Sequence, residues 1–295
     1  MNVLLTGATG YIGSVVAEAL RQAGHSVVGV ARSDEAAERL QERGHQPVRG
    51  DLSNPEGISA AARDADAVIH TASTNDMNAP AADQATTSAL LDALAGSGKR
   101  YVYTGGVWVY GNTDEAVVDE DSPLNPPMIV AWRPAVENLV LAAQGRGVHP
   151  IVLRPAMVYG RGGGLPAMLV GQARGGGPVR YPGTGENHWP LVHVDDLADL
   201  YVRALEQAPI GAMYLGATDE TMRLRALAEE AARLGGDSVR AEAWPLDEAR
   251  AAMGPLADAL ALDQHVSGAK AMRELGWAPH APSLADELGA GSYSK

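Results

Sequence analysis

The sequence predicts an α/β protein with a doubly wound parallel sheet and a smaller, mostly C-terminal lobe. Short apolar runs alternate with helical patterns through the first half of the chain. These runs are apolar throughout, which is typical of strands covered on both faces. A glycine-rich turn directly follows the first run. Together the three observations indicate a Rossmann-type sheet.

Six strands can be assigned in order, each bounded by turn residues or by a helical pattern. They cover Asn2–Thr6, Ser26–Ala31, Gln46–Arg49, 67–71, Arg100–Thr104 and 151–154. Helical patterns separate them at 14–24, at 34–43, from residue 55 onward and at 81–95. Right-handed crossovers between such strands place helices on both faces of one sheet.

The turn after the first strand has the composition of a dinucleotide-binding loop. Gly7 permits a tight turn, Gly10 lets the backbone approach a pyrophosphate, and Gly13 lets helix and strand pack closely. The helix that follows presents its N-terminus to the negative charge of the phosphates. We therefore expect the cofactor to contact the residues of this loop, which are Gly7, Thr9, Gly10, Tyr11, Ile12 and Gly13.

The alternation of strands and helices ends after residue 154, which sets the predicted domain boundaries. Glycine clusters at 162–164 and 175–177 interrupt the pattern, and residues 191–208 resume it with a strand and a helix. We predict a dinucleotide-binding domain at 1–154, completed by about 191–210. The predicted substrate lobe comprises 155–190 and 211–295, where short helices dominate.

The composition disfavours several classes of function. The 295 residues include 23 Lys and Arg against 36 Asp and Glu, which gives a net charge of −13. Such a surface repels phosphate groups, so we expect neither nucleic acid nor a membrane as partner. The absence of cysteine excludes thiolate ligands, and the His, Asp and Glu spacings predict no metal site. The N-terminus lacks a basic signal-peptide start, which predicts a cytoplasmic protein.

Further short motifs follow the glycine turn in a fixed order. They are Asp51-Leu52, His70-Thr71-Ala72-Ser73, Val109-Tyr110-Gly111, Leu153-Arg154-Pro155, Val192-His193-Val194-Asp195-Asp196-Leu197-Ala198 and Leu275-Gly276-Trp277. With the spacing TGxxGxxG in the turn, the chain resembles the extended and atypical short-chain dehydrogenase/reductase superfamily, which includes NAD(P)-dependent epimerases and dehydratases. The resemblance implies cofactor contacts for Asp51, Leu52, Thr71, Ala72, Ser73 and Pro155.

The end of the second strand favours NADP over NAD. NAD enzymes carry an acid there that binds the ribose hydroxyls. This sequence has Ala31 at that position, followed by Arg32 and Ser33. A guanidinium can bind a 2′-phosphate through two hydrogen bonds, whereas a carboxylate would repel it. Asp34 lies close by and weakens the preference.

The catalytic triad of the resembled superfamily is absent. The resemblance places its Ser, Tyr and Lys at Gly106, Ile129 and Arg133. Ile129 has no ionisable atom, and Arg133 stays protonated near neutrality, so neither can donate a proton there. Pro134 predicts that the helix begins near Arg133 and that segment 126–133 is rebuilt. Arg133 is still expected to bind the ribose of the cofactor.

The proton donor is therefore left open by the sequence. Asn75 and Asp76 follow the fourth strand, where members of the superfamily approach cofactor and substrate. With Arg133, they are the candidate catalytic residues. Water or a ribose hydroxyl is the alternative source of the proton.

Four large apolar residues are predicted to form a substrate pocket: Met77, Trp108, Met157 and Trp189. Trp108 follows the vacated Ser position by two residues, so strand alternation directs it toward the cleft. Trp189 occupies the position where nucleotide-sugar enzymes of the superfamily carry a diphosphate-binding arginine. This replacement disfavours a nucleotide sugar and favours an apolar or planar ligand.

We therefore expect an NADP-dependent reductase of a small, largely apolar carbonyl, imine or enone. An imine or enone fits the absent Tyr better than a ketone, because neither needs a strong acid during hydride transfer. Two alternatives stay open: a non-redox isomerase, dehydratase or cyclase on the same scaffold, and a non-catalytic NADP-binding sensor. The expected partner is a small-molecule substrate, and the sequence leaves a homodimer open.

Overall fold

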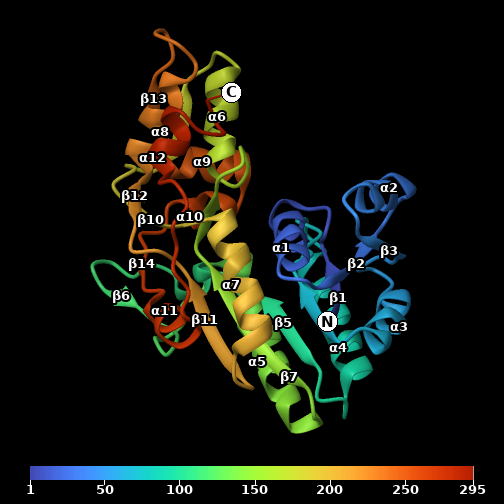
Figure 1. Cartoon of the computed structure of the whole chain (residues 1–295). Helices are drawn as coiled ribbons and strands as arrows, with labels where there is room; N and C mark the ends of the chain where they lie inside the picture. The colour runs from blue at the N-terminus through green and yellow to red at the C-terminus, as the bar shows by residue number, and fades with distance from the viewer. Residues whose placement is uncertain (295) are drawn as a thin grey trace.

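A parallel sheet of seven strands forms the centre of the protein, in a computed structural model that describes residues 1–294. Its order is β11-β7-β5-β4-β1-β2-β3, and every neighbouring pair runs parallel (Figure 1). The strands are β1 (Asn2–Thr6), β2 (Ser26–Ala31), β3 (Gln46–Arg49), β4 (Ala67–His70), β5 (Arg100–Thr104), β7 (His149–Pro155) and β11 (Ala212–Gly216). The strand order changes direction beside β1, which confirms the predicted doubly wound fold.

Apolar side chains fill both faces of the central strands. Val3, Leu4 and Leu5 of β1 have no exposed surface, and all four residues of β4 are buried. Continuous apolar runs of this kind are stable only between two covering layers. β1, β2 and β5 have the bounds that their apolar runs predict, and β3 also has its predicted bounds although none of its residues is fully buried.

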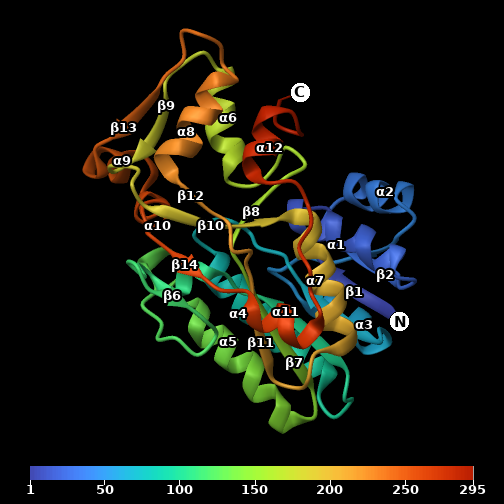
Figure 2. The same ribbon diagram turned by 60° about the vertical axis from the view of Figure 1, so that its left-hand side comes forward.

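Three helices contribute to the core on each face of the sheet (Figure 2). On one face lie α1 (Tyr11–Gln22), α2 (Asp34–Glu42) and α7 (Val194–Gln207), and on the other α3 (Glu56–Asp64), α4 (Ala79–Leu94) and α5 (Arg133–Ala142). α1 packs against α7, and α4 packs against both α3 and α5. α5 starts at Arg133 with a proline in its first turn, as predicted from Pro134.

Short elements form a second group beside the sheet (Figure 2). β10 (His188–His193) pairs with β8 (Met157–Tyr159) and β12 (Thr221–Arg223), β9 (Val179–Pro182) pairs with β13 (Ala241–Trp244), and β6 (Val117–Val118) pairs with β14 (His265–Val266). The helices are α6 (Pro166–Arg174), α8 (Leu224–Arg233), α9 (Leu246–Met253), α10 (Leu256–Leu260), α11 (Ala269–Leu275) and α12 (Leu284–Gly289). Three 3-10 turns are η1 (Val107–Tyr110), η2 (Met128–Val130) and η3 (Ala143–Arg146). Among residues 1–294, no helix has both the length and the apolarity needed to cross a bilayer.

The structure differs from the predicted boundaries at two strands. β11 belongs to the central sheet, where it pairs with β7, although residues 211–295 were assigned to the other lobe. β10 was expected to return to the sheet, but it pairs with β8 and β12 instead. Its neighbour α7 does cover the central sheet. Local patterns identify a strand but do not determine its partner. The sequence alone therefore could not predict that β11, rather than β10, joins the central sheet.

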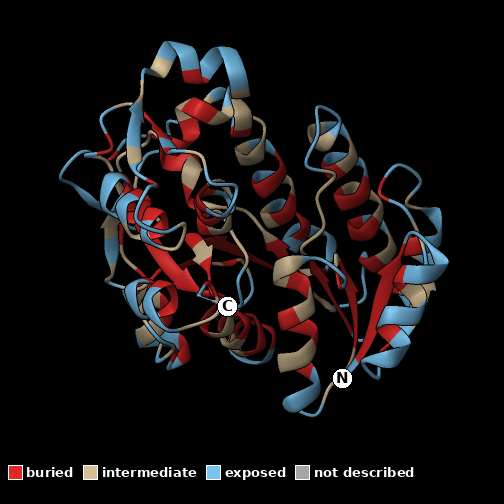
Figure 3. Cartoon of the chain, turned by 90° about the horizontal axis from the view of Figure 1, so that it is seen from above, coloured by how far each residue is buried: buried red, intermediate tan, exposed pale blue. Residues whose placement is uncertain are grey.

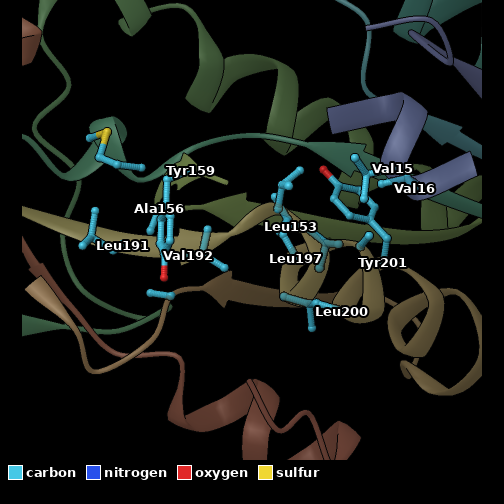
Figure 4. Close-up of a cluster of buried hydrophobic side chains, with 14 of the residues drawn as sticks. Val15, Val16, Leu153, Ala156, Tyr159, Leu191, Val192, Leu197, Leu200 and Tyr201 are labelled. Carbon is cyan, nitrogen blue, oxygen red and sulfur yellow. The ribbon is translucent and has the colours of Figure 1, made fainter. Parts of the chain in front are cut away.

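One hydrophobic core joins the central sheet to the second group of elements. Buried residues follow the strands and the inner sides of the helices, while exposed residues lie on the outer surfaces (Figure 3). In Figure 4 the core runs from Val15 and Tyr201 past Leu153 to Leu191 and Val192. This shared core fixes the position of the second group of elements relative to the central sheet.

Candidate functional site

A cleft of about 750 Å³ lies at the carboxyl ends of the central strands. It extends from the end of β2 across the loops after β1, β4 and β5 to the end of β7. Of the fifteen residues predicted to contact the cofactor, all but one line it: Gly7, Thr9, Gly10, Tyr11, Ile12, Gly13, Arg32, Ser33, Leu52, Thr71, Ala72, Ser73, Arg133 and Pro155. The carboxyl edge of a parallel sheet at a switch in strand order is where such folds bind ligands.

The glycine loop has no room for a side chain at Gly7 or Gly13. Gly7 has a φ of +75°, and a Cβ there would lie 2.7 Å from Thr71 Oγ1. A Cβ on Gly13 would lie 2.1 Å from the Gly7 carbonyl oxygen. Gly10, at the N-cap of α1, has no side chain to accept from the first helical turn. The backbone N–H groups of the first turn of α1 therefore stay available to an anion such as a pyrophosphate.

The end of the cleft beside β2 is basic. Arg32 and Arg39 both line it, and Ser33 lies between β2 and α2. The Ser33 Oγ accepts a hydrogen bond from Ala36 N at 3.1 Å, which leaves its hydroxyl hydrogen free to donate to a ligand. Asp34 does not line the cleft, and its carboxylate pairs with Arg49 at 2.9 Å. Among the described residues that line the cleft, the charged ones are all arginines.

Asp51 is the one predicted cofactor residue that does not line the cleft. Its Oδ1 accepts from Ser53 Oγ at 2.6 Å and from Ser53 N at 2.8 Å. These hydrogen bonds hold the pKa of Asp51 below its usual value. The carboxylate thus closes a local turn, while the adjacent Leu52 contributes to the cleft.

The segment that carries the expected triad positions does not form one continuous helix. Residues 128–130 form the turn η2, and the helix starts only at Arg133. Val130, rather than Ile129, lines the cleft, and the carbonyl of Ile129 accepts from Trp132 Nε1 at 3.2 Å. Gly106 lines the cleft without a side chain. The Ser and Tyr positions therefore present no hydroxyl to a substrate.

Arg133 is held in the cleft by contacts on its guanidinium. Nη1 donates to the Thr104 carbonyl at 3.1 Å and approaches the Tyr103 hydroxyl at 3.5 Å. The guanidinium also lies over the Trp132 ring, 4.6 Å from its centroid. A guanidinium fixed at this point can bind ribose hydroxyls.

A buried polar chain lies behind Arg133. Thr6 Oγ1 is 2.6 Å from His70 Nδ1, and His70 Nε2 is 3.1 Å from Asp83 Oδ1. Tyr103 donates to the other Asp83 oxygen at 2.7 Å. Burial and the nearby Asp83 carboxylate raise the pKa of Tyr103. This tyrosine keeps its proton for Asp83 and does not line the cleft.

The two candidates after β4 differ in position. Asn75 lines the cleft with a left-handed backbone, φ +54°, and its N–H donates to Ser73 Oγ at 3.2 Å. Asp76 lies outside the cleft, where it accepts from Thr74 Oγ1 at 2.7 Å. That bond and a second from Asn78 N lower the pKa of Asp76. Neither the position of Asp76 nor this lowered pKa supports its assignment as a proton donor.

The far end of the cleft is apolar, but only two of the four predicted pocket residues form it. Trp108 and Met157 line it, together with Val107, Val130, Ala156, Val158 and Leu165. Trp189 is 1% exposed in the core and donates from Nε1 to the Leu260 carbonyl at 2.9 Å. Met77 is 94% exposed and outside the cleft. The place of Trp189 depends on its contact with the distant Leu260 segment, which the sequence does not show.

Sequence reasoning missed further lining residues. Thr104 ends β5 and Gly105 directly follows it, so their place at the same sheet edge was the available signal. Thr104 Oγ1 is engaged with the Tyr201 hydroxyl at 2.6 Å. Arg39 lies three residues after Ala36 on α2, and helical spacing puts both on one face.

Comparisons with known proteins agree with this geometry. Residues 3–215 match the sequence model described as NAD dependent epimerase/dehydratase family. The uncharacterized protein YLL056C of Saccharomyces cerevisiae is 32% identical, over 100% of this chain and 99% of its own. The 4-hydroxy-2-methyl-3-oxo-4-farnesyl-3,4-dihydroquinoline-1-oxide ketoreductase of Stigmatella aurantiaca is 28% identical, over 85% and 78%. Thermus thermophilus UDP-glucose 4-epimerase, solved in complex with NAD, has a similar fold at 23% identity, with a TM-score of 0.81 over 98% of this chain and 100% of its own.

Proposed function

The chain belongs to the NAD dependent epimerase/dehydratase family, and we propose that it is an NADPH-dependent reductase of a small, largely apolar carbonyl, imine or enone. One observation carries the proposal: a single cleft that is basic at one end and apolar at the other. The basic end fits a phosphorylated ribose, and the apolar end fits an uncharged substrate.

The preference for NADPH rests on the charges beside β2. Arg32 and Arg39 converge there, and the nearest acid, Asp34, is paired with Arg49. A 2′-phosphate would gain charge-assisted hydrogen bonds from the two guanidiniums and from the Ser33 hydroxyl. Free ribose hydroxyls would find no carboxylate among the described lining residues, so NADH binds less tightly.

The substrate class rests on the walls of the opposite end. Trp108, Val130 and Met157 offer apolar surface, and Gly106 leaves space where the superfamily has a hydroxyl. A nucleotide sugar is disfavoured because residue 189, the expected diphosphate-binding position, is a buried tryptophan. The Stigmatella aurantiaca relative is named a ketoreductase, which supports a carbonyl or a related electrophile.

The residues of the chain would position the reaction and leave the proton to another source. Hydride donation is the chemistry that bound NADPH supplies. Arg133 would hold the ribose hydroxyls through the donors that do not bind the Thr104 carbonyl. Trp108 and Met157 would exclude water from the acceptor carbon. The proton would come from water or a ribose hydroxyl in the space beside Gly106. An iminium substrate needs no strong acid, and an enolate product can be protonated after hydride transfer.

The test is oxidation of NADPH with a panel of apolar ketones, cyclic imines and enones. We expect loss of the nicotinamide absorbance to match product formation one to one, with at least tenfold preference for NADPH over NADH. Substrate turnover without net absorbance change would support the isomerase, dehydratase or cyclase alternative. Tight NADPH binding with no conversion of any substrate would support the sensor alternative.

A further inference from the structure

Two histidines and an aspartate meet outside the cleft, where the start of β10 lies beside β14 and the residues just before it. His188 Nδ1 lies 3.0 Å from Asp263 Oδ1, and His265 Nε2 lies 3.8 Å from the same oxygen. One ligand atom from each of the three lies within 4.8 Å of the others. We propose that His188, Asp263 and His265 bind a divalent transition-metal ion, with Zn²⁺ as the best match.

The geometry suits a tetrahedral ion. Zinc binds nitrogen and oxygen at about 2.0–2.2 Å, so two of its tetrahedral ligands lie about 3.3–3.5 Å apart. Two of the three separations, 3.0 Å and 3.8 Å, fall on either side of this value, and the third is within 4.8 Å. The side chains are 25%, 33% and 25% exposed in chain order, so water can complete the coordination. Two imidazoles and one carboxylate are a donor set that zinc prefers over magnesium or calcium.

Hydrogen bonds from separate segments hold the three ligands in place. Asp263 Oδ1 accepts from the His188 backbone N–H at 2.6 Å. The Asp263 N–H donates to Asn112 Oδ1 at 2.9 Å, and the His265 N–H donates to Thr113 Oγ1 at 2.8 Å. Such outer contacts reduce the entropy lost when a metal orders its ligands.

Arg223 competes with the metal for His188. Its Nε donates to His188 Nε2 at 3.3 Å, which puts the imidazole proton on Nδ1, facing Asp263. A metal at Nδ1 would displace this proton to Nε2 and end the bond from Arg223. The Arg223 side chain is 60% exposed and can turn toward Glu186, which lies 3.9 Å away. Removing Arg223 should therefore tighten metal binding.

The metal site would stabilise the wall of the cleft that carries Trp108. Gln264 lies between two of the ligands and is fully buried. Its Nε2 donates to the carbonyls of Val107 at 2.9 Å and Gly111 at 2.8 Å. These two residues bracket the turn that carries Trp108. An ion that fixes residues 263–265 would thus also stabilise the apolar end of the cleft.

The experiment is a calorimetric titration of Zn²⁺ into tag-free, EDTA-stripped protein, with melting curves in parallel. We expect one equivalent to bind and the melting temperature to rise. Asp263→Asn and His265→Gln should each weaken binding at least roughly tenfold. Arg223→Gln should strengthen it. His280→Gln removes a histidine whose side chain is 87% exposed outside the cluster and should bind as the wild type does.

The proposal fails if no stoichiometric binding is measured, or if His280→Gln weakens binding as much as His265→Gln. It also fails if Asp263→Asn and His265→Gln bind zinc like the wild type. Melting curves in EDTA show whether each variant is folded. Should a ligand variant not fold, the absorption spectrum of Co²⁺ added to the wild type decides. Strong bands of a four-coordinate ion support the site, and the weak bands of the hexaaqua ion overturn it.

Discussion

The two ends of the cleft are built from different material. The phosphate end comprises the glycine loop, where the backbone of Gly7 packs against Gly13 in the first turn of α1, and the basic end with Arg32 and Arg39 beside it. The reaction end consists of side chains from separate elements, among them Trp108, Arg133 and Met157. The phosphate end has the TGxxGxxG spacing on which the resemblance rests, while at the reaction end Gly106, Ile129 and Arg133 stand where the resemblance places Ser, Tyr and Lys. A backbone site tolerates no added atom, whereas side-chain walls can be exchanged without loss of the cavity.

The largest effect is expected at the phosphate end. A Cβ on Gly13 would lie 2.1 Å from one backbone atom and 2.6 Å from another, so Gly13→Ala must displace the loop. We expect no measurable NADPH binding in a titration. Gly171→Ala is the matched control, because nothing lies within 4 Å of its added Cβ on α6. That control should bind normally and gain stability of about 0.5–1 kcal/mol. Normal binding by Gly13→Ala would break the contrast between the two ends.

Two tryptophans sharpen the definition of the apolar end. Trp189→Ala empties a buried core position and should lower the free energy of unfolding by about 3–5 kcal/mol, measured by denaturant titration. Trp108→Ala should raise the substrate KM and leave NADPH affinity unchanged, because it removes only a wall of the cleft. If Trp189→Ala instead raised the substrate KM without lowering the free energy of unfolding, Trp189 would be part of the substrate site.

Arg32 tests whether the basic end selects NADPH. Loss of one charge-assisted phosphate contact is worth about 1.5–3 kcal/mol. Arg32→Ala should therefore weaken NADPH roughly ten- to a hundredfold and leave NADH nearly unchanged. Fluorescence titration with both cofactors measures this difference. Equal losses would mean that the arginine contacts a group common to both.

The smallest effect concerns pH. The pKa of Tyr103 is raised above 10 by burial and by Asp83, so the phenol stays protonated at and below about pH 10. A tyrosine whose pKa is raised by folding contributes to the free energy of unfolding below pH 10. This contribution is lost as the pH rises further. Tyr103→Phe should keep the shape of the activity–pH profile between about pH 7 and 10, and should lower the melting temperature by removing a donor to Asp83. An alkaline limb that disappears in this variant would identify Tyr103 as a catalytic acid.

The same contrast explains what the sequence could predict. The central strands and the glycine loop were predictable because neighbouring residues determine them, and Pro134 marked the start of α5 for the same reason. Two failures depend on contacts between distant segments: Trp189 packs against the Leu260 segment, and β11 pairs with β7. The third is local, because Asp51 accepts hydrogen bonds from Ser53 instead of lining the cleft.

The metal cluster shows this limit most clearly. His188 and His265 lie far apart in the sequence and become neighbours only because β10 packs against β14. No spacing rule for metal ligands covers such a pair. The sequence predicted no metal site, and the structure instead assembles a candidate from two segments.

The position of β11 has a consequence for synthesis on the ribosome. β7 ends at Pro155, but its outer neighbour begins only at Ala212. At ~5–20 residues per second, residues 156–211 take on the order of several seconds to translate. During this interval the emerging chain leaves the edge of β7 unpaired, and such an edge can recruit strands from other chains. Nascent chains halted before residue 212 should therefore need chaperone protection, whereas chains released after residue 216 can close the sheet themselves.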